Sequence, residues 1–474
     1  MKPERVKGTR DFSPSQVNRR NYIFNTLAGI FVNFGFQAIE TPAMERLSTL
    51  EGKYGEEGDN LLYKLRTNKN LFSTLLKRHA GKPKGEHSIE TTLASLKRYY
   101  PEGFVPMESD KGLRYDLTVP FARYAVMHRN EIQLPFKRYQ IQNVWRGDRP
   151  QKGRYREFYQ CDVDVIGSDS LLYEAELIQI YDQAFAAFGL KVVIRLNNRK
   201  LLEGLAAYCG HADLFQPIVV LIDKLDKITW EGVARELKDL GLNERAIAKA
   251  KSFIACVDLE DLMNLAGIDE IEIARQGIEE LREVLSFLKE YAFQNQLQID
   301  FSLARGLSYY TGCIYEVVID TKAKGQEKIK MGSIGGGGRY ANLTGIFGWK
   351  GISGVGVSFG ADRIYDVLEE LNLFDDENFN TTKVLIMAMG KAELKYGFSI
   401  AQKLRKVSVA TEVFPDVVHP KKLSKKLKYP DSRGIPYVII IGKQEMQSGR
   451  LQVKDMQTRT ETQQTLDGLI QQWA

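Results

Sequence analysis

Hydrophobic and polar residues alternate through residues 156–166, and this period of two predicts a β-strand. One side of the strand carries Tyr159, Cys161, Val163 and Val165, and the other carries a ring, an amide and two acids at Phe158, Gln160, Asp162 and Asp164. The loop before it holds four basic residues, Arg146, Arg149, Lys152 and Arg154. The pattern alone fits an ordinary hairpin with a solvated polar face. It equally fits a site that holds a polyanion at the loop and an amine-bearing ligand beside it.

A helix is predicted near the N-terminus, because Ser13 is a suitable N-cap and Pro14 suits the first turn. We expect this helix to end near Phe34, before Gly35. The sequence that follows alternates like a strand, which Pro42 interrupts because proline cannot donate to a sheet.

Two further stretches have helical periodicity. Residues 170–188 repeat apolar positions with the spacing of a helix that faces a core, and residues 200–295 are almost wholly helical in pattern. Residues 66–112 are rich in Lys, Gly and Ser and have no clear period, so we predict a loop or a small insertion there.

The last part of the chain is organised differently. Residues 371–382 are acidic and polar, which is typical of a linker. In residues 383–474, apolar runs suited to strands alternate with amphipathic helices. This order predicts a small sheet of parallel type with flanking helices.

Length and composition narrow the class of protein. A chain of 474 residues is expected to form two or three domains, and 43% hydrophobic with 27% charged residues indicates a globular chain. No apolar run reaches the ~18 residues of a membrane span, and the N-terminus lacks the apolar core of a signal peptide. Neither the four cysteines nor the five histidines have metal-ligand spacing. We therefore expect free thiols, no transition metal and a cytoplasmic location.

The net charge of +6 is unevenly distributed. Residues 383–474 carry 16 Lys and Arg against 8 Asp and Glu, whereas residues 1–382 carry 50 against 52. A basic module beside a near-neutral one suits a partner that is an elongated polyanion. Taken alone, a lysine-rich helix face is more often merely solvated.

The segment 136–167 resembles motif 2 of the class II aminoacyl-tRNA synthetases, and its run GDRPQKGRYREFYQCDVDV is similar to that of the histidyl-tRNA synthetase family. Other runs of the same family follow in the expected order, at 7–14 (KGTRDFSP), 113–124 (LRYDLTVPFARY), 303–317 (LARGLSYYTGCIYEV), 332–343 (GSIGGGGRYANL) and 354–364 (GVGVSFGADRI). The run at 303–317 is specific to the histidine branch of the class.

This resemblance implies an α+β catalytic core with a mainly antiparallel sheet in residues 1–370, interrupted by the helical block 200–295 as an inserted domain. It also implies a linker at 371–382 and an α/β anticodon-binding domain at 383–474. The N-terminal helix and strand correspond to motif 1, which builds the dimer interface in this class, so a homodimer is expected.

Members of the family join the carboxylate of L-histidine to the α-phosphate of ATP, release pyrophosphate, and then transfer histidine to the 3′ end of tRNA(His). Fixed cations are needed where negative charge grows on the phosphates. By resemblance, Arg146 contacts the α-phosphate, Arg305 lies near the α-phosphate and the substrate carboxylate, and Arg363 lies on the γ-phosphate side. Phe158 stacks on adenine, and either Glu157 or Arg154 lies close to the nucleotide. Mg²⁺ is expected with ATP, but no protein ligands are evident from spacing.

The histidine site implied by the resemblance consists of Asp116, Thr118, Gln160, Asp164, Tyr309 and Tyr310. Asp116 and Gln160 are expected near the α-amino group, and Asp164 with the two tyrosines around the imidazole. Many bacterial relatives carry Glu in place of Asp116 and Asp164, which leaves the depth of the pocket open. The glycine run within 333–340 either lets backbone approach a ligand closely or forms a plain flexible turn.

The loop 147–153 is expected to meet the acceptor stem of tRNA, with Arg149, Gln151 and Lys152 as candidates. Two rivals remain. One is the regulatory subunit of ATP phosphoribosyltransferase, a paralogue that lacks the C-terminal domain and usually degrades the 303–317 motif. The other is a class II synthetase for a different amino acid, against which LARGLSYY and Asp164 argue.

Overall fold

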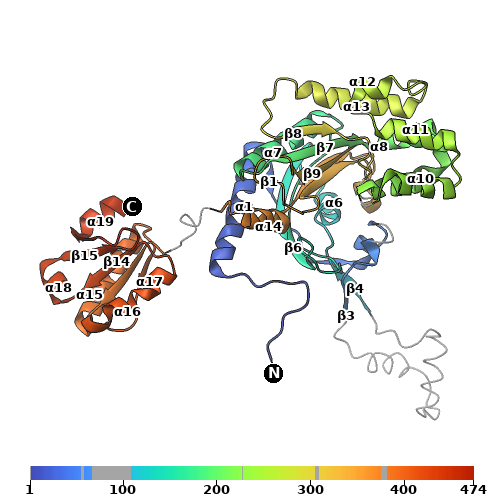
Figure 1. Cartoon of the computed structure of the whole chain (residues 1–474). Coiled ribbons are helices and arrows are strands. Elements are labelled where there is room, and N and C mark those ends of the chain that lie inside the picture. Colours follow the sequence, from blue (N-terminus) through green and yellow to red (C-terminus); the bar gives the residue numbers. More distant parts are fainter. Residues whose placement is uncertain are drawn as a thin grey trace, which may run out of the picture. The chain divides into compact units, whose positions relative to one another are not determined.

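The computed structural model describes residues 2–54, 58–66, 108–226, 228–304, 309–374 and 382–473 (Figure 1). The chain divides into two compact units. One comprises Met1–Asp11 with Arg20–Leu373, and the other comprises Phe12–Arg19 with Phe374–Ala474.

The first unit is built on a mainly antiparallel sheet, as predicted. In spatial order its strands are β1 (Gln37–Ala38), β5 (Phe136–Trp145), β6 (Glu157–Ile166), β11 (Gly354–Gly360), β10 (Gly335–Tyr340), β9 (Cys313–Ile319), β7 (Val192–Asn198) and β8 (Gln296–Ile299). The two outermost pairs, β1–β5 and β7–β8, run parallel, and the pairs between them run antiparallel. A small sheet of β2 (Met44–Arg46), β4 (Glu108–Leu113) and β3 (Lys64–Arg66) accompanies it.

The predicted strand at 156–166 is β6, which pairs with β5 on one side and β11 on the other. Its alternation is confirmed, but its polar face is not solvated. Asp162 and Asp164 are each only 2% exposed, so both faces of the strand are buried. Acidic side chains are rarely buried without partners or function, so the polar face marks a site.

The helices of this unit include the two predicted near residues 14–34 and 170–188. They are α1 (Pro14–Asn33), α2 (Leu47–Leu50), α6 (Thr118–Met127), α7 (Leu172–Ala187) and α14 (Ala361–Glu370). Helix α1 begins at Pro14 with Ser13 Oγ accepting from the backbone N–H of Gln16 at 3.4 Å, and Gly35 follows its end with φ +79°. Helix α7 packs against the sheet, with Tyr181 and Phe185 fully buried near Phe359 of β11.

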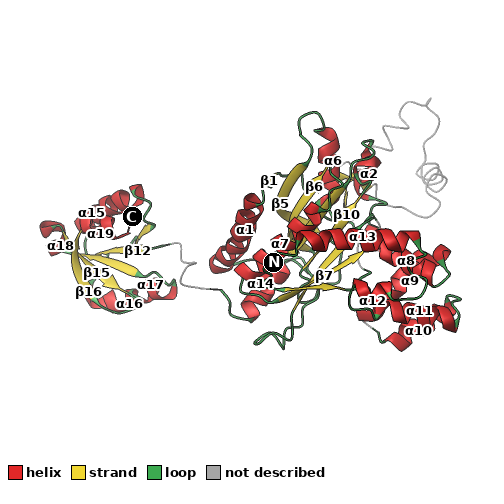
Figure 2. Ribbon diagram, turned by 90° about the horizontal axis from the view of Figure 1, so that it is seen from above, coloured by secondary structure: helices red, strands yellow, loops and turns green. Residues whose placement is uncertain are grey.

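The helical block lies in the chain between the parallel neighbours β7 and β8 (Figure 2). It contains α8 (Arg199–Tyr208), α9 (Phe215–Ile222), α10 (Trp230–Asp239), α11 (Glu244–Ile254), α12 (Leu259–Met263) and α13 (Glu272–Phe287). The block belongs to the same compact unit as the core. That it forms a separate inserted domain with the bounds 200–295 stays a prediction. Within residues 66–112, the structure describes only Arg66 and residues 108–112, which belong to strand β4. The rest of the predicted insertion lies outside the described residues.

The second unit contains a five-stranded sheet in the order β13 (Thr411–Val413), β12 (Val384–Ala388), β14 (Tyr437–Ile441), β15 (Arg450–Asp455) and β16 (Glu461–Thr465). Its helices are α15 (Lys391–Lys406), α16 (Leu423–Lys426), α17 (Lys428–Ser432), α18 (Lys443–Ser448) and α19 (Leu466–Trp473). The first three strands are parallel, as predicted, but β15 and β16 add an antiparallel edge. Strand β16 is polar and largely exposed at that edge, so it gave little strand signal. Strand β15 alternates polar residues with the buried Leu451 and Val453, a signal that the prediction did not use. Within the described residues, no helix is long and apolar enough to cross a membrane.

Candidate active site

A cleft with an empty volume of about 1010 Å³ opens on the polar face of β6. Nine of the residues predicted as substrate contacts line it: Asp116, Thr118, Arg146, Arg154, Phe158, Gln160, Tyr309, Tyr310 and Arg363. They come from the start of α6, the ends of β5 and β6, the residues before β9, and the start of α14. Residues far apart in sequence thus converge on one hollow.

Arg146 and Arg363, two of the arginines predicted to contact phosphate, line the cleft. Arg146 Nε donates to the carbonyl of Tyr115 at 3.1 Å, and its guanidinium lies 4.2 Å from the Tyr115 ring and 5.3 Å from the Phe158 ring. Arg363 Nε donates to the carbonyl of Gly153 at 2.7 Å. Arg305 lies outside the described residues, so its predicted role remains a prediction.

Three buried oxygens on this side of the sheet have neither a hydrogen-bond nor an ion-pair partner within the described part of the chain: Asp116 Oδ2, Gln160 Oε1 and Asp162 Oδ1. A fourth, Asp164 Oδ2, makes no hydrogen bond but is ion-paired with Arg138. The other ends of two of these side chains are fixed. Asp116 Oδ1 accepts from the hydroxyl of Tyr54 at 3.0 Å and from the backbone N–H of Val119 at 3.1 Å, and Gln160 Nε2 donates to Ser358 Oγ at 2.9 Å. A buried acceptor without a donor is costly. These three oxygens therefore suit a ligand that brings its own N–H groups.

Asp164, predicted as an imidazole contact, is already engaged by the protein. Its Oδ2 lies 2.7 Å from Arg138 Nη2, and its Oδ1 accepts from the hydroxyl of Tyr340 at 2.8 Å. Asp162, two residues earlier on the same face, has one oxygen, Oδ1, with neither a hydrogen bond nor an ion pair among the described residues. Both acids line a small side pocket, which shares Thr118, Tyr310, Gly336 and Ser358 with the main cleft.

Burial raises the pKa of each acid in this group. The pKa of Asp162 rises to about 7, because burial and the neighbouring Asp164 outweigh the attraction of Arg138. Burial likewise raises the pKa of Asp164 and of Asp116, against the opposing effects of Arg138 and Arg146 respectively. A cationic or N–H-bearing ligand would stabilise the charged forms.

Asp162 is a candidate site residue that the sequence did not single out, as are Ser358 and Asp362, which line the cleft. Alternation placed Asp162 on the ligand face with Gln160 and Asp164, but the resemblance supplied no role for it. The available signal was an acid at period two between two predicted ligand residues.

The glycine run forms strand β10 in the interior of the sheet, so the alternative of a flexible turn is wrong. A Cβ at Gly337 would lie 2.2 Å from the carbonyl oxygen of Gly356 on the neighbouring strand. The run therefore lets β10 and β11 approach closely, and Gly335 and Gly336 line the cleft with backbone.

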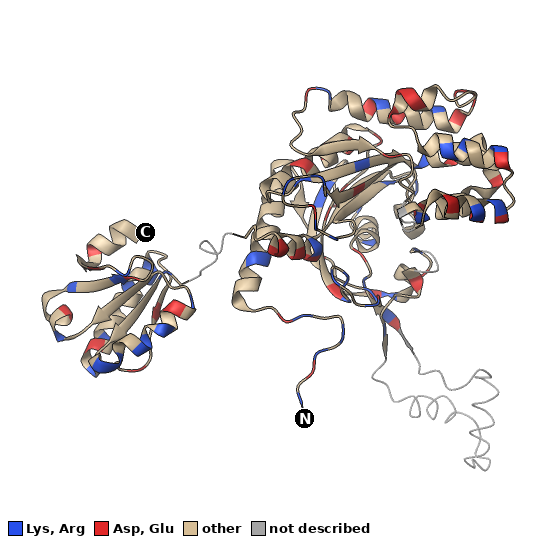
Figure 3. Cartoon of the chain, viewed as in Figure 1, with Lys and Arg blue, Asp and Glu red and all other residues tan. Residues whose placement is uncertain are grey.

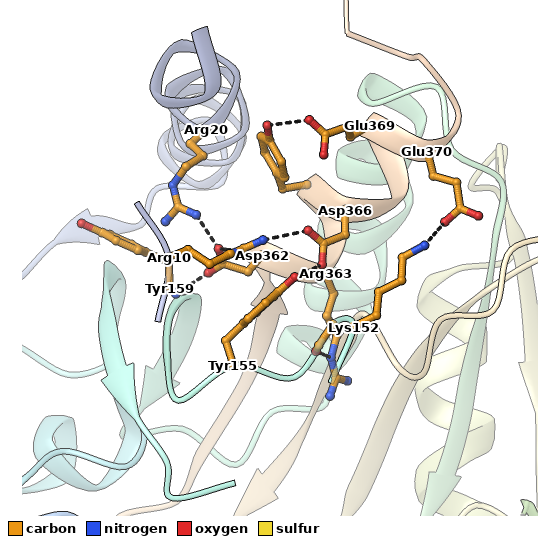
Figure 4. A network of polar contacts seen from close by, with 12 residues as sticks. Arg10, Arg20, Lys152, Tyr155, Tyr159, Asp362, Arg363, Asp366, Glu369 and Glu370 are labelled. Atoms are coloured by element: carbon orange, nitrogen blue, oxygen red, sulfur yellow. Dashed lines mark hydrogen bonds and ion pairs between the residues drawn. The ribbon is translucent and has the colours of Figure 1, made fainter. Parts of the chain in front are cut away.

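The loop residues proposed for tRNA do not line the cleft. Arg149, Gln151 and Lys152 are exposed, and Lys152 Nζ lies 2.6 Å from Glu370 Oε2 of α14. Figure 4 shows this pair beside Arg363 and the acids Asp362 and Asp366. Exposure is compatible with contact to a large partner, and their predicted role is not tested by this geometry.

The donor set does not fit a metal ion held by the protein alone. Among the described residues, no group of three His, Cys, Asp or Glu side chains is placed to hold one. Magnesium bound through phosphates keeps several waters and needs few protein ligands. The four cysteines are free, with Cys161, Cys209 and Cys313 buried.

Comparison with known proteins agrees with this geometry. Residues 108–364 match the family model described as histidyl-tRNA synthetase, and residues 383–472 match that of an anticodon binding domain. The chain is 48% identical over 473 residues to a histidine–tRNA ligase of Bacteroides fragilis, covering 99% of this chain and 98% of the relative. It is 49% identical over 461 residues to that of Porphyromonas gingivalis, covering 97% and 96%.

A crystal structure of histidyl-tRNA synthetase from Nostoc sp. PCC 7120 superposes with a TM-score of 0.79 at 27% identity, covering 100% of this chain and 99% of that one. The fold is that of a class II synthetase core with a C-terminal anticodon-binding domain. The chain belongs to the histidyl-tRNA synthetase family.

Proposed function

We propose that this chain is a histidine–tRNA ligase. It activates L-histidine with ATP to histidyl-adenylate and pyrophosphate, and then transfers histidine to the 3′ end of tRNA(His). The observation that carries the proposal is the set of three buried acceptors without donors, Asp116, Gln160 and Asp162, beside an arginine-lined cleft. Such a set matches an amino acid whose α-ammonium and side-chain N–H both need partners.

In the first step, a carboxylate oxygen of histidine attacks the α-phosphorus of ATP, and the bond to the β-phosphate oxygen breaks. Arg146 balances charge on the α-phosphate, and Arg363 binds the outgoing pyrophosphate end. Arg305 is assigned near the same phosphorus by resemblance alone. Phe158 stacks on adenine, and Arg154 lies beside the nucleotide. Mg²⁺, bound chiefly through the phosphates, would supply further positive charge there.

Histidine is held by acceptors at both ends. Asp116 and Gln160 receive the α-ammonium group, with Thr118 beside them. Asp162 accepts an imidazole N–H in the side pocket. Asp164 is bound to Arg138 and Tyr340, and its negative charge lies next to Asp162 on the same strand face. Tyr309 and Tyr310, whose rings lie 5.0 Å apart, close the walls. Side chains without N–H leave Asp162 unpaired, which excludes them.

In the second step, a terminal hydroxyl of tRNA attacks the adenylate carbonyl and AMP leaves. Arg149, Gln151 and Lys152 meet the acceptor stem, and the basic C-terminal unit binds the anticodon end. Figure 3 shows Lys and Arg on this unit, which include the exposed Lys421, Lys422, Lys425 and Lys428 around α16. The enzyme works in the cytoplasm as a homodimer built through the motif 1 helix and strand.

Amino-acid-dependent ATP–pyrophosphate exchange without tRNA tests the proposal, with each amino acid supplied in turn. Exchange with histidine alone is expected. Exchange with another amino acid would favour a different synthetase, and no exchange at all would favour the regulatory paralogue. Charging of a tRNA(His) transcript then tests the second step.

A further inference from the structure

The N-terminal residues 7–10 lie against the loop 146–156 that joins β5 to β6. The backbone N–H of Arg156 donates to the carbonyl of Gly8 at 2.9 Å, and Arg156 Nη1 donates to that of Lys7 at 3.4 Å. Gly8 has φ +89°, and a Cβ there would lie 2.8 Å from Cγ of both Arg156 and Pro150. The segment therefore contacts the loop at two places, one of them directly after Arg154 and Tyr155.

Arg10 of this segment links the loop to helix α14 (Figure 4). Its guanidinium lies 3.6 Å from the centre of the Tyr155 ring, and its Nη1 lies 2.9 Å from Asp366 Oδ1. The hydroxyl of Tyr155 donates to Asp366 Oδ2 at 2.7 Å, so Asp366 holds both partners. Arg10 Nη2 also donates to Asp362.

These contacts are shielded from water. The side chains of Asp362 and Asp366 are 4% and 9% exposed, and that of Arg10 is 20% exposed. Burial and the hydrogen bond to Asp366 raise the pKa of Tyr155 to about 12, so its hydroxyl stays protonated at neutral pH. Asp362 accepts in addition from Arg20 and from the backbone N–H of Tyr159, which fixes its carboxylate.

The loop is thus held at three successive places. Arg363 binds the carbonyl of Gly153, Asp366 and Arg10 hold Tyr155, and Gly8 binds Arg156. Arg154 lies between the first two and lines the cleft. Asp362 lines the cleft as well, directly before Arg363.

We propose that Arg10 is a positioning residue for ATP: it fixes the loop that carries Arg154 and neutralises Asp362 and Asp366 beside the phosphate site. This inference rests on the proposed function for the identity of the nucleotide. Loss of Arg10 should weaken ATP binding in two ways. The loop loses one of its attachments, and two buried acids next to a polyphosphate lose a cation.

The test compares Arg10→Gln with Arg10→Lys and with the control Arg5→Gln. Arg5 belongs to the same segment, but its side chain is 58% exposed and its Nε lies 3.6 Å from Asp11, which is 86% exposed. ATP affinity is measured by calorimetry without amino acid, and exchange kinetics give KM for ATP and for histidine. Arg10→Gln should weaken ATP binding at least about tenfold with KM for histidine unchanged. The ATP affinity of Arg10→Lys should lie between those of the wild type and Arg10→Gln. The lysine ammonium keeps the charge but cannot bridge two carboxylates as the planar guanidinium does.

Wild-type ATP affinity in Arg10→Gln would overturn the inference. So would an equal loss for ATP and histidine together with a lowered Tm, which would indicate a general structural role. If Arg10→Gln does not fold, Tyr155→Phe is measured instead, because it removes only the hydroxyl that binds Asp366. Unchanged ATP affinity in Tyr155→Phe would overturn the inference, and weakened affinity would support it. A wild-type protein that binds ATP but shows no histidine-dependent exchange would refute the proposed function, while the calorimetry would still decide the role of Arg10.

Discussion

Arg138 and Asp164 form an ion pair in the interior of the catalytic unit, with Nη2 and Oδ2 2.7 Å apart and side chains 0% and 3% exposed. The two residues face each other across the β5–β6 ladder. Arg138 also lies 4.3 Å from the Phe121 ring, so its cation is packed as well as paired. One buried cation thus serves two acids, because Asp162 on the same face is attracted to Arg138 too.

Replacing this cation should be costly. Arg138→Met leaves two buried acids without a positive charge, and we expect the free energy of unfolding to fall by about 3–5 kcal/mol. Urea denaturation measures it. Lys152→Met is the matched control, because the Lys152–Glu370 pair is exposed and should contribute less than about 1 kcal/mol. Equal, small losses in the two variants would contradict the importance of the buried pair.

The stability of the protein should depend on Asp162 near neutral pH. The pKa of Asp162 is about 7 in the folded protein, above its value in the unfolded chain, so the folded state binds this proton more tightly. The stabilisation is fully present below the unfolded pKa and is lost as pH rises through about 7. Asp162→Asn should therefore gain stability relative to the wild type between about pH 5 and about pH 8.

Unfolding in urea at several pH values checks this slope. Because Asp162 and Asp164 share Arg138, the slope belongs to the pair of acids. Asp455→Asn serves as the control, since backbone hydrogen bonds lower the pKa of Asp455 and its effect should be flat in this window. If the free energies of unfolding of the wild type and Asp162→Asn change with pH in parallel, the Asp162 carboxyl does not titrate in this pH range. In exchange assays, Asp162→Asn should raise KM for histidine and leave ATP affinity unchanged.

Arg305 is assigned to the reacting phosphate by its motif, and this assignment can be tested directly. Arg305→Ala should remain folded but lose at least ~100-fold in the rate of adenylate formation, because a cation is removed where negative charge grows. Single-turnover formation of histidyl-adenylate measures the step. Near-normal activation would refute the assignment.

Removing residues 383–474 should separate the two half-reactions. The excess positive charge lies in this part, whereas the cleft residues all precede it. Activation should survive in the truncated protein, while tRNA affinity and aminoacylation should fall strongly. Filter binding of tRNA(His) and exchange assays on the same preparation give both values. Unchanged tRNA affinity would mean that the basic unit is merely solvated.

Several features could be predicted from sequence because they depend on local order. The alternation in 156–166, the N-cap at Ser13 and the apolar period of 170–188 each became the expected element. Ordered motifs likewise indicated the family and most residues that line the cleft. Strand β16 was not predicted because an exposed edge strand has little apolar pattern, whereas β15 does alternate and was overlooked.

The sequence by itself determined which chemical groups are available: alternating acceptors on β6, arginines in three motifs and a basic C-terminal part. Only the tertiary structure decided how these groups are used. The alternation along the strand cannot distinguish Asp162 from Asp164, because both lie on the same face. In the folded chain, Arg138 and Tyr340 bind Asp164, whereas Asp162 Oδ1 has no partner among the described residues. Similarly, Arg10 and Asp366 are separated by 356 positions and meet only because the N-terminal segment and α14 border the same loop. Pair interactions over such separations depend on sheet order and burial, which no local pattern encodes.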